Sequence, residues 1–263
     1  MTSYHRQAYN KKTYFISMIW ALVVREFKGR YRRSLLGPLW ALIQPLFYMV
    51  LFTFIRGIFT ISSEGTPYII FSYCALVPWT FFSTAVSRCG NSIYGYASLI
   101  KKIPLDREVY LLANIIISVI EFFISAIILV AMMIWFKTPV GAALLWLPLL
   151  IAVLLVITFA FGLGFAAVGT YKQDVLFGIP FLMQFWMLAS PVAYPISQVP
   201  EGRRLLYSLN PMVGVIEGFR NVLVKNMAPD LTLLAISIVV TIAVLAVCWP
   251  MFRYLSQYFA DVI

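Results

Sequence analysis

The sequence predicts an all-α, polytopic membrane protein with six transmembrane helices, an N-terminal amphipathic helix and short external re-entrant helices. Of its 263 residues, 62% are hydrophobic and only 11% are charged, whereas a soluble domain is about 45–50% apolar and about 25% charged. The charged residues gather between long apolar segments, most of which supply the roughly 20 residues that a membrane-crossing helix needs. Lipid is therefore the main solvent expected for this chain.

Residues 14–33 predict the amphipathic helix. Ile16, Trp20, Val23, Phe27 and Tyr31 recur at steps of three or four residues, which places them on one face. The apolar centre is shorter than a bilayer requires, so we expect the helix to lie in the headgroup plane. The alternative is a short cytoplasmic helix packed on the protein's own loops. A cationic patch accompanies this helix: Arg25, Lys28, Arg30, Arg32 and Arg33.

Six apolar segments follow, and together they make a transmembrane domain of residues 38–263 after a tail and surface helix of residues 1–37. Gly37-Pro38 predicts the bend into the first span, and Pro45 predicts a kink within it. The expected spans cover about residues 38–61, 68–87, 109–136, 144–169, 176–190 and 231–252.

Small residues in the fourth span favour close helix approach. The segment 196–230 is punctuated by prolines, and its two amphipathic pieces, about 201–208 and 212–226, are too short and polar to span. We expect these pieces to be interfacial or re-entrant.

The distribution of Lys and Arg predicts the orientation. Most of these residues lie in the N-terminal segment, in the expected loop 88–107, at Lys172 and in the C-terminal tail. Cytoplasmic loops carry such an excess, so both termini are expected inside and the segment 196–230 outside. The same distribution accounts for the net charge of +10 without nucleic acid as a partner.

No motif for catalysis or metal binding is present in the sequence. It contains neither a GxxxxGK[ST] loop nor a GxSxG elbow, and its single histidine and three scattered cysteines offer no metal-ligand cluster. Only Glu121 and Arg56 are expected within spans, where isolated charges are costly, and their roles stay open. A pump of this kind therefore needs a partner that captures energy.

Five segments in order resemble the membrane subunit of ABC-2 type exporters of cell-surface polysaccharides, such as O-antigen, capsule and teichoic acid. They cover almost the whole chain: RYRRSLLGPLWALIQPL (30–46), SLIKKIPLDREV (98–109), QDV (173–175), SPVAYPISQVPE (190–201) and LNPMVGVIEGFR (209–220). The resemblance implies a transport permease of the bacterial cytoplasmic (inner) membrane, and not an enzyme.

The resemblance further implies a homodimer with two ABC ATPase subunits, which would bind ATP and Mg while this chain holds no cofactor. Helix 14–33 resembles the family's interface helix. The segment 98–109 resembles the coupling helix that meets the ATPase, and about 196–228 resembles the external gate helices. Many relatives have a proline or an aromatic residue where this chain has Asp106. The implied ATPase-coupling residues are Lys101, Lys102, Asp106, Arg107 and Glu108, and the implied gate residues are Tyr194, Glu217 and Arg220.

Two aromatic stripes are compatible with a long sugar chain, because sugar rings stack their apolar faces on aromatic rings. The stripes are Tyr48, Phe52 and Phe59 in the first span and Phe177, Phe181 and Phe185 in the fifth. Packing against lipid or other helices explains them equally well. The cationic patch would likewise attract either anionic membrane lipids or the pyrophosphate of a lipid-linked polymer.

These features favour an ATP-driven exporter of a lipid-linked, O-antigen-like polysaccharide. Two alternatives stay open: an ABC-2 exporter of a drug or small lipid, and a membrane scaffold or integral enzyme in envelope synthesis.

Overall fold

The computed structural model describes residues 11–32, 34–102 and 106–262, and these residues form helices joined by turns and loops, without a strand. Five helical segments of this part of the chain are long and apolar enough to cross a membrane. They are η1 and α2 (Gly37–Leu39, Trp40–Ile58), α3 (Tyr68–Gly95), α5 (Glu108–Trp135), η2 and α6 (Ala142–Trp146, Leu147–Tyr171) and α10 (Leu231–Ser256). The prediction of an all-α, multi-pass membrane protein is confirmed.

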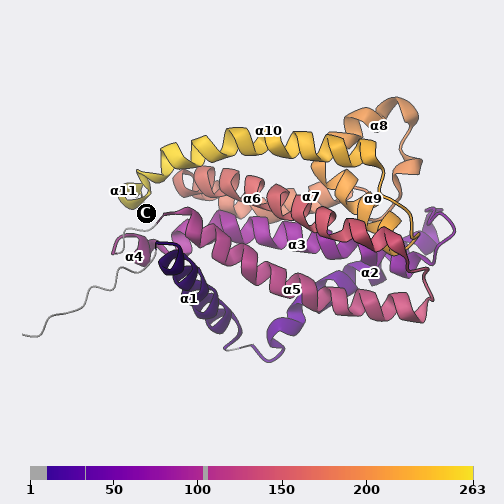
Figure 1. The fold of residues 1–263 in the computed structure, drawn as a ribbon, viewed down its shortest axis with the longest axis horizontal. Helices are drawn as coiled ribbons and strands as arrows, with labels where there is room; N and C mark the ends of the chain where they lie inside the picture. Colours follow the sequence, from indigo (N-terminus) through magenta and orange to yellow (C-terminus); the bar gives the residue numbers. More distant parts are fainter. Residues whose placement is uncertain (1–10, 33, 103–105, 263) are drawn as a thin grey trace, which may run out of the picture.

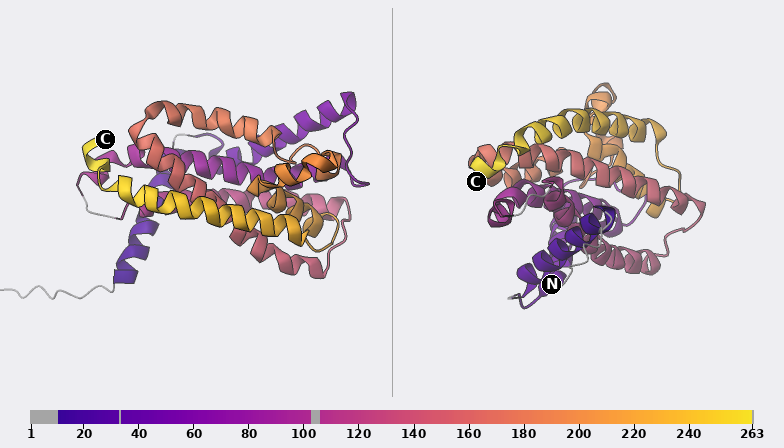
Figure 2. Two further views of the ribbon diagram at one scale, coloured as in Figure 1. Left: turned by 90° about the horizontal axis from the view of Figure 1, so that it is seen from above. Right: turned by 60° about the vertical axis from the view of Figure 1, so that its left-hand side comes forward.

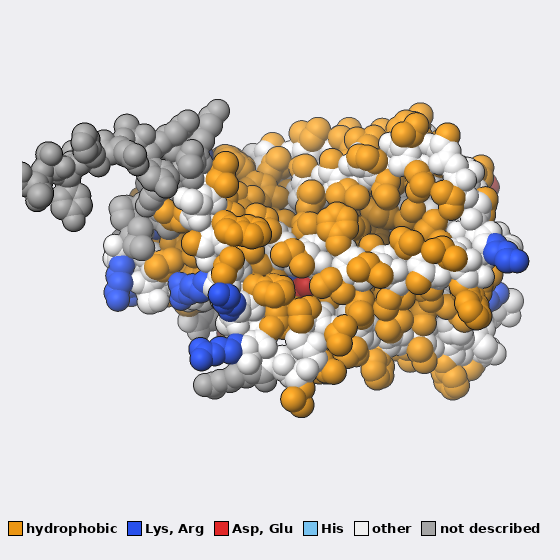
Figure 3. Space-filling view, turned by 60° about the horizontal axis from the view of Figure 1, so that its bottom comes forward, with side chains coloured by type: hydrophobic (Ala, Val, Ile, Leu, Met, Phe, Trp, Pro, Cys, Tyr) orange, Lys and Arg blue, Asp and Glu red, His pale blue; other side chains and the backbone are white. Residues whose placement is uncertain are grey.

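These helices run roughly along one axis of the molecule (Figure 1). Figure 3 shows a wide apolar band on one face, with the Lys and Arg side chains gathered toward its two ends. That pattern is the one expected of a protein whose middle lies in hydrocarbon and whose ends reach the headgroups.

Helix α3 is the centre of the bundle. In its most apolar stretch of 18 residues, 83% of the residues are buried. The helices that pack against it are α2, α5, α6, α7 (Gln173–Leu188) and α9 (Pro211–Leu223). Gly162 of α6 permits one close approach, because a Cβ added there would lie 2.9 Å from the Cβ of Cys89 in α3. The predicted role of small residues in this span is confirmed.

The surface helix α1 (Lys11–Tyr31) lies across the long helices at one end of the bundle (Figure 2). It packs on α5 and buries Leu22 and Val23, whereas Trp20 is 61% exposed. The chain then turns into η1 through Gly37, whose φ of +52° is a conformation that glycine adopts without strain. The bend predicted at Gly37-Pro38 is confirmed.

Helix α3 continues two turns beyond the predicted end of the second span. The segment 88–107, expected as a polar loop of helical character, is helical in its first half, but this half belongs to α3 and not to a loop between spans. Polar side chains in this part bond to carbonyls one turn back, from Ser87 to Ser83 (2.7 Å) and from Asn91 to Ser87 (2.9 Å). Since these groups are satisfied within the helix, they do not terminate it.

The predicted helix 98–109 is not continuous. Helix α4 covers only Ala97–Ile100, and Glu108 is already the first residue of α5. Residues 103–105 of this segment lie outside the described part.

The two amphipathic pieces beyond the fifth span differ from each other. Helix α8 (Glu201–Ser208), which follows η3 (Ile196–Gln198), is largely exposed, as an interfacial helix would be. Helix α9, by contrast, is buried over almost its whole length against α3, α6 and α10. The interfacial alternative is therefore wrong for α9, and the re-entrant alternative stays a prediction. Pairing of its charged residues, described below, explains why a sequence that looks too polar is buried. The short α11 (Phe259–Val262) ends the chain.

Candidate functional site: a polar groove along α3

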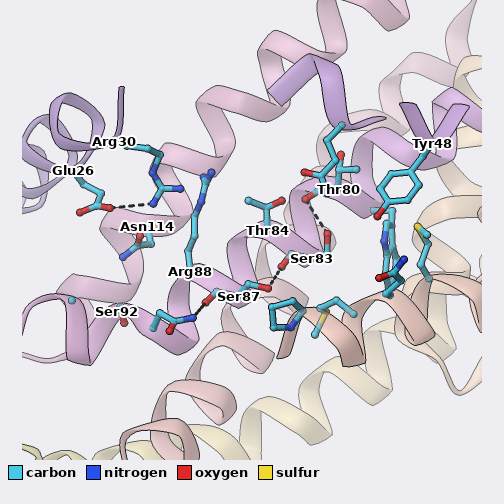
Figure 4. Close-up of a pocket in the computed structure, with 18 of the residues that line it drawn as sticks. Glu26, Arg30, Tyr48, Thr80, Ser83, Thr84, Ser87, Arg88, Ser92 and Asn114 are labelled. Atoms are coloured by element: carbon cyan, nitrogen blue, oxygen red, sulfur yellow. Dashed lines mark hydrogen bonds and ion pairs between the residues drawn. The ribbon is translucent and has the colours of Figure 1, made fainter. Parts of the chain in front are cut away.

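A groove of about 600 Å³ runs along α3 between α1, α2, α5 and α7. A second cavity of about 380 Å³ adjoins it on the α5 side and shares Arg30, Gln44, Thr80, Thr84 and Arg88 with it. Figure 4 shows its length: Glu26 and Arg30 lie at one end, Arg88 in the middle, and Thr80 and Tyr48 at the other end. The groove thus leads from the surface helix into the bundle.

Polar side chains of α3 form its floor, and all of them except Arg88 are small. They recur at steps of three and four residues, which keeps them on one helix face: Thr80, Ser83, Thr84, Ser87, Arg88, Asn91 and Ser92. The hydroxyl groups of Thr80 and Ser87 donate to carbonyls of their own helix. A hydroxyl oxygen that donates in this way still accepts hydrogen bonds, so the floor presents acceptors to a guest.

The other walls combine polar and apolar groups. Helix α2 contributes Gln44 and Tyr48, and α7 contributes Gln184 beside Met183 and Met187. Mixed walls of this kind suit a ligand that has both hydroxyl groups and apolar faces.

An ion pair stands in the wall at the middle of the groove. Both terminal nitrogens of Arg88 reach Glu121 of α5, at 2.7 and 2.8 Å, and one also donates to the Ser118 hydroxyl at 2.9 Å. The Tyr31 hydroxyl of α1 donates to the same carboxylate at 2.5 Å. Burial, together with this bond to a carboxylate, raises the pKa of Tyr31 to about 12. Three helices are therefore joined at Glu121.

The cationic patch is divided by the structure. Arg30 lines the groove and pairs with Glu26 at 3.1 Å, and Arg25 lies over the ring of Tyr96, 5.6 Å from its centroid. Lys28 and Arg32 are exposed. Arg33 lies outside the described residues.

The aromatic stripes do not form one lining. Tyr48 lines the groove, but Phe52, stacked on it at 6.1 Å, is buried behind, and Phe59 follows the last residue of α2 instead of sharing its face. The α7 stripe of Phe177, Phe181 and Phe185 is exposed on a face adjacent to the groove-lining face.

The residues assigned to ATPase coupling lie at the end of the bundle that carries α1 and α4 (Figure 1). Lys101, Lys102 and Asp106 are exposed and Arg107 is half-buried. Glu108 accepts a hydrogen bond from Arg253 of α10 at 3.2 Å.

The three residues assigned to the gate meet at Arg220: Glu217 is buried beside it, and the half-buried Tyr194 contributes its backbone carbonyl. Arg220 is fully buried and donates to Glu217 (2.9 Å) and to the carbonyls of Val192 (2.6 Å) and Tyr194 (3.4 Å). Its guanidinium carbon also lies 3.7 Å from the ring centroid of Phe71. The buried charge of Arg220 is tolerated because the Glu217 carboxylate balances it and backbone carbonyls accept its hydrogen bonds.

The two charges whose roles the sequence left open have different partners. Glu121 pairs with Arg88, whereas Arg56 donates to the Ile61 carbonyl at 3.2 Å and lies over the Tyr68 ring.

Sequence reasoning missed the floor of the groove. Its signal was present, because Thr80, Ser83, Thr84, Ser87 and Asn91 recur at helical spacing inside an otherwise apolar segment. Ending the second span at Ser87 separated Arg88 and Asn91 from this pattern and hid it.

An apolar belt, charged ends and a polar groove between membrane-spanning helices define a multi-pass helical membrane protein suited to moving a polar substrate. A family model described as "ABC-2 type transporter" matches residues 17–224. The chain belongs to this family of transporter membrane proteins.

Named relatives have similar lengths. The chain is 27% identical over 260 residues to the O-antigen export system permease protein RfbA of Myxococcus xanthus, covering 97% of both chains. It is 22% identical over 214 residues to the RfbA protein of Klebsiella pneumoniae, covering 81% of this chain and 82% of the relative. The polysialic acid transport protein KpsM of Escherichia coli is 22% identical over 200 residues, with coverages of 75% and 77%.

Proposed function

We propose that the chain is the membrane subunit of an ATP-driven exporter that moves a lipid-linked, O-antigen-like polysaccharide across the bacterial cytoplasmic membrane. The observation that carries the proposal is the groove, which offers hydroxyl and amide groups along α3 and the aromatic ring of Tyr48. A sugar chain presents hydroxyl groups and apolar C–H faces, so both types of wall have a counterpart on it. The named relatives, two O-antigen export permeases and a polysialic acid transport protein, support the same substrate class.

The proposal includes a homodimer with two ABC ATPase subunits, which would hydrolyse ATP because this sequence has no phosphate-binding loop. The described chain encloses the groove only in part, and the face of α7 with Phe177, Phe181 and Phe185 is exposed. A second copy would close the groove into a channel.

We also propose six spans, in which α7 is the fifth along the chain and is added to the five long apolar helices. Its 16 residues correspond to about 24 Å of helix, and the turn at Ser190-Pro191 continues its path toward the outer surface. Both termini would then be cytoplasmic, in agreement with the distribution of Lys and Arg.

In this orientation α1, α4 and the start of α5 would face the ATPase, with Lys101, Lys102, Asp106, Arg107 and Glu108 at the contact. The α8–α9 region, with the cluster of Tyr194, Glu217 and Arg220, would form the external gate. The exposed Lys28 and Arg32 of α1 would lie among anionic lipid headgroups.

Deletion of the gene in its host, followed by complementation, tests this function. The deletion strain should lose its surface polysaccharide and accumulate lipid-linked polymer inside, and the wild-type gene should restore both. Co-purification in mild detergent should recover an ABC ATPase with the chain. An unchanged cell surface without internal polymer would contradict the proposed substrate, and the absence of an ATPase would contradict the proposed assembly.

A further inference from the structure

The charges of the groove are balanced within the protein. Among its described lining residues there are two cations, Arg30 and Arg88, and each is paired with a carboxylate: Arg30 with Glu26 of the same lining, and Arg88 with Glu121, which lines the adjoining cavity. The remaining polar groups of the floor are hydroxyl and amide groups. The described wall therefore carries no formal charge that a passing anion would neutralise.

Because the Arg88–Glu121 pair is buried, this balance of charges affects which substrates can pass. The side chains are 13% and 9% exposed, and Phe81 and Phe122 lie beside them in the same cavity. In such surroundings a charge without a partner is strongly disfavoured, because water screens it poorly. Both carboxylate oxygens of Glu121 already bind Arg88, and one also accepts from Tyr31, so the cation is held in place and is not free to follow a substrate.

From this balance we infer that the groove is built for an electrically neutral sugar chain and discriminates against chains with a carboxylate on each repeat. This inference rests on the proposed function and narrows its substrate. Neutral sugars exchange hydrogen bonds with Ser83, Thr84, Ser87 and Asn91 without bringing a charge into the bundle. A chain of sugar acids would bring one unpaired carboxylate after another past the Arg88–Glu121 pair. Family membership leaves this point open, because the relatives include both O-antigen export permeases and a polysialic acid transport protein.

Glu121 is the residue that sets the preference for neutral over acidic sugar chains. The substitution Glu121→Gln keeps the shape of the side chain but leaves Arg88 with an unpaired positive charge, which would attract carboxylates. The double substitution Arg88→Gln, Glu121→Gln removes both charges and makes the wall neutral again. Glu64→Gln is the matched control, because Glu64 is also a paired carboxylate but lies outside the groove, bonded to Lys225.

The test uses the full complex of this chain with its ATPase, reconstituted in vesicles. Two lipid-linked chains are compared: a polymer of neutral hexoses, and the same polymer with its free primary hydroxyls oxidised to carboxylates. ATP-dependent transport of the oxidised chain should be slower by about tenfold or more in the wild type. The ratio of the transport rate of the neutral chain to that of the oxidised chain should fall by about threefold or more in Glu121→Gln. It should return toward the wild-type value in the double variant and stay unchanged in Glu64→Gln.

The outcomes separate the two proposals. Equal transport of both chains by the wild type would overturn the neutral-chain inference while leaving the exporter function intact. Transport of neither chain would overturn the exporter function, and the inference with it. If Glu121→Gln does not assemble, the wild-type ratio and the double variant still decide, since a double variant that assembles and transports both chains equally would contradict the inference.

Discussion

Among the residues that line the groove, Arg88 is the one that we expect to tolerate substitution least. Its guanidinium group is held by Glu121 and Ser118 inside the bundle. Arg88→Gln should lower the free energy of unfolding by about 3–5 kcal/mol, because it leaves the Glu121 carboxylate buried without a counter-charge. Denaturant unfolding in detergent micelles measures this loss. The double variant with Glu121→Gln should lose less than the two single variants combined, and strict additivity would show that the pair is not coupled.

Glu64, which lies outside the groove, makes a pH-dependent contribution to the stability of the folded protein. Burial acts to raise the pKa of its carboxyl group, but hydrogen bonds from Lys225 and Ser197 outweigh it, and the net pKa lies below the ordinary value of 4.5. Because the folded-state pKa is lowered, the stabilisation is present above the unfolded value and is lost as the pH falls through the folded value.

Glu64→Gln should therefore reduce stability by about 0.5–1 kcal/mol at neutral pH and have little effect once the carboxyl group is protonated. Thermal unfolding of both proteins at neutral and acidic pH checks this. A difference that persists at acidic pH would mean that Glu64 acts by packing and not by its charge.

The roles of individual residues could be predicted from the sequence only where the charge of a side chain and its place along the chain were enough to indicate them. The family resemblance assigned Tyr194, Glu217 and Arg220 to one external gate, although Tyr194 belongs to a different matched segment from the other two. The partner of Glu121 could not be predicted, because Arg88 was expected outside the membrane. Helix ends are hard to place when polar side chains bond to their own helix, and this error concealed the pair.

At the scale of the helices, the contact between α3 and α6 depends on a small residue at Gly162. Gly162→Ala should destabilise the protein by about 1–3 kcal/mol, because its new methyl group would meet the Cβ of Cys89 in a packed interior. Gly29→Ala in α1 is the control, since nothing lies within 4 Å of a Cβ added there. That variant should be neutral or stabilised by about 0.5–1 kcal/mol. Equal effects of the two substitutions in thermal unfolding would refute the close contact.

The long helices were predictable because apolar length is a direct consequence of membrane thickness. The expected spans 109–136 and 231–252 correspond closely to α5 and α10. The burial of α9 could not be predicted from the sequence for a physical reason. Its Glu217 and Arg220 neutralise each other at 2.9 Å, whereas hydropathy counts each charge as if it stood alone. The rotation of α7, which turns Met183 and Gln184 toward the groove, depends on packing that a single helix does not encode.

For the whole molecule, the central claim is that the polar groove along α3 is the path of the exported polymer. Composition predicted a membrane protein, and the ordered motifs predicted its family. The path itself required the structure, because it is assembled from α1, α2, α3, α5 and α7, and only the α3 stripe is visible in sequence.

Cysteine labelling during export tests this claim most directly. In an active variant whose Cys74, Cys89 and Cys248 are replaced, Ser87→Cys places a thiol on the groove floor, and Ile127→Cys places one on the lipid-facing side of α5, where Ile127 is 68% exposed. A water-soluble, bulky thiol reagent should label Ser87→Cys and stop polysaccharide export, and should do neither at Ile127→Cys. Labelling of Ser87→Cys with export intact, or no labelling in the active complex, would contradict the groove as the path.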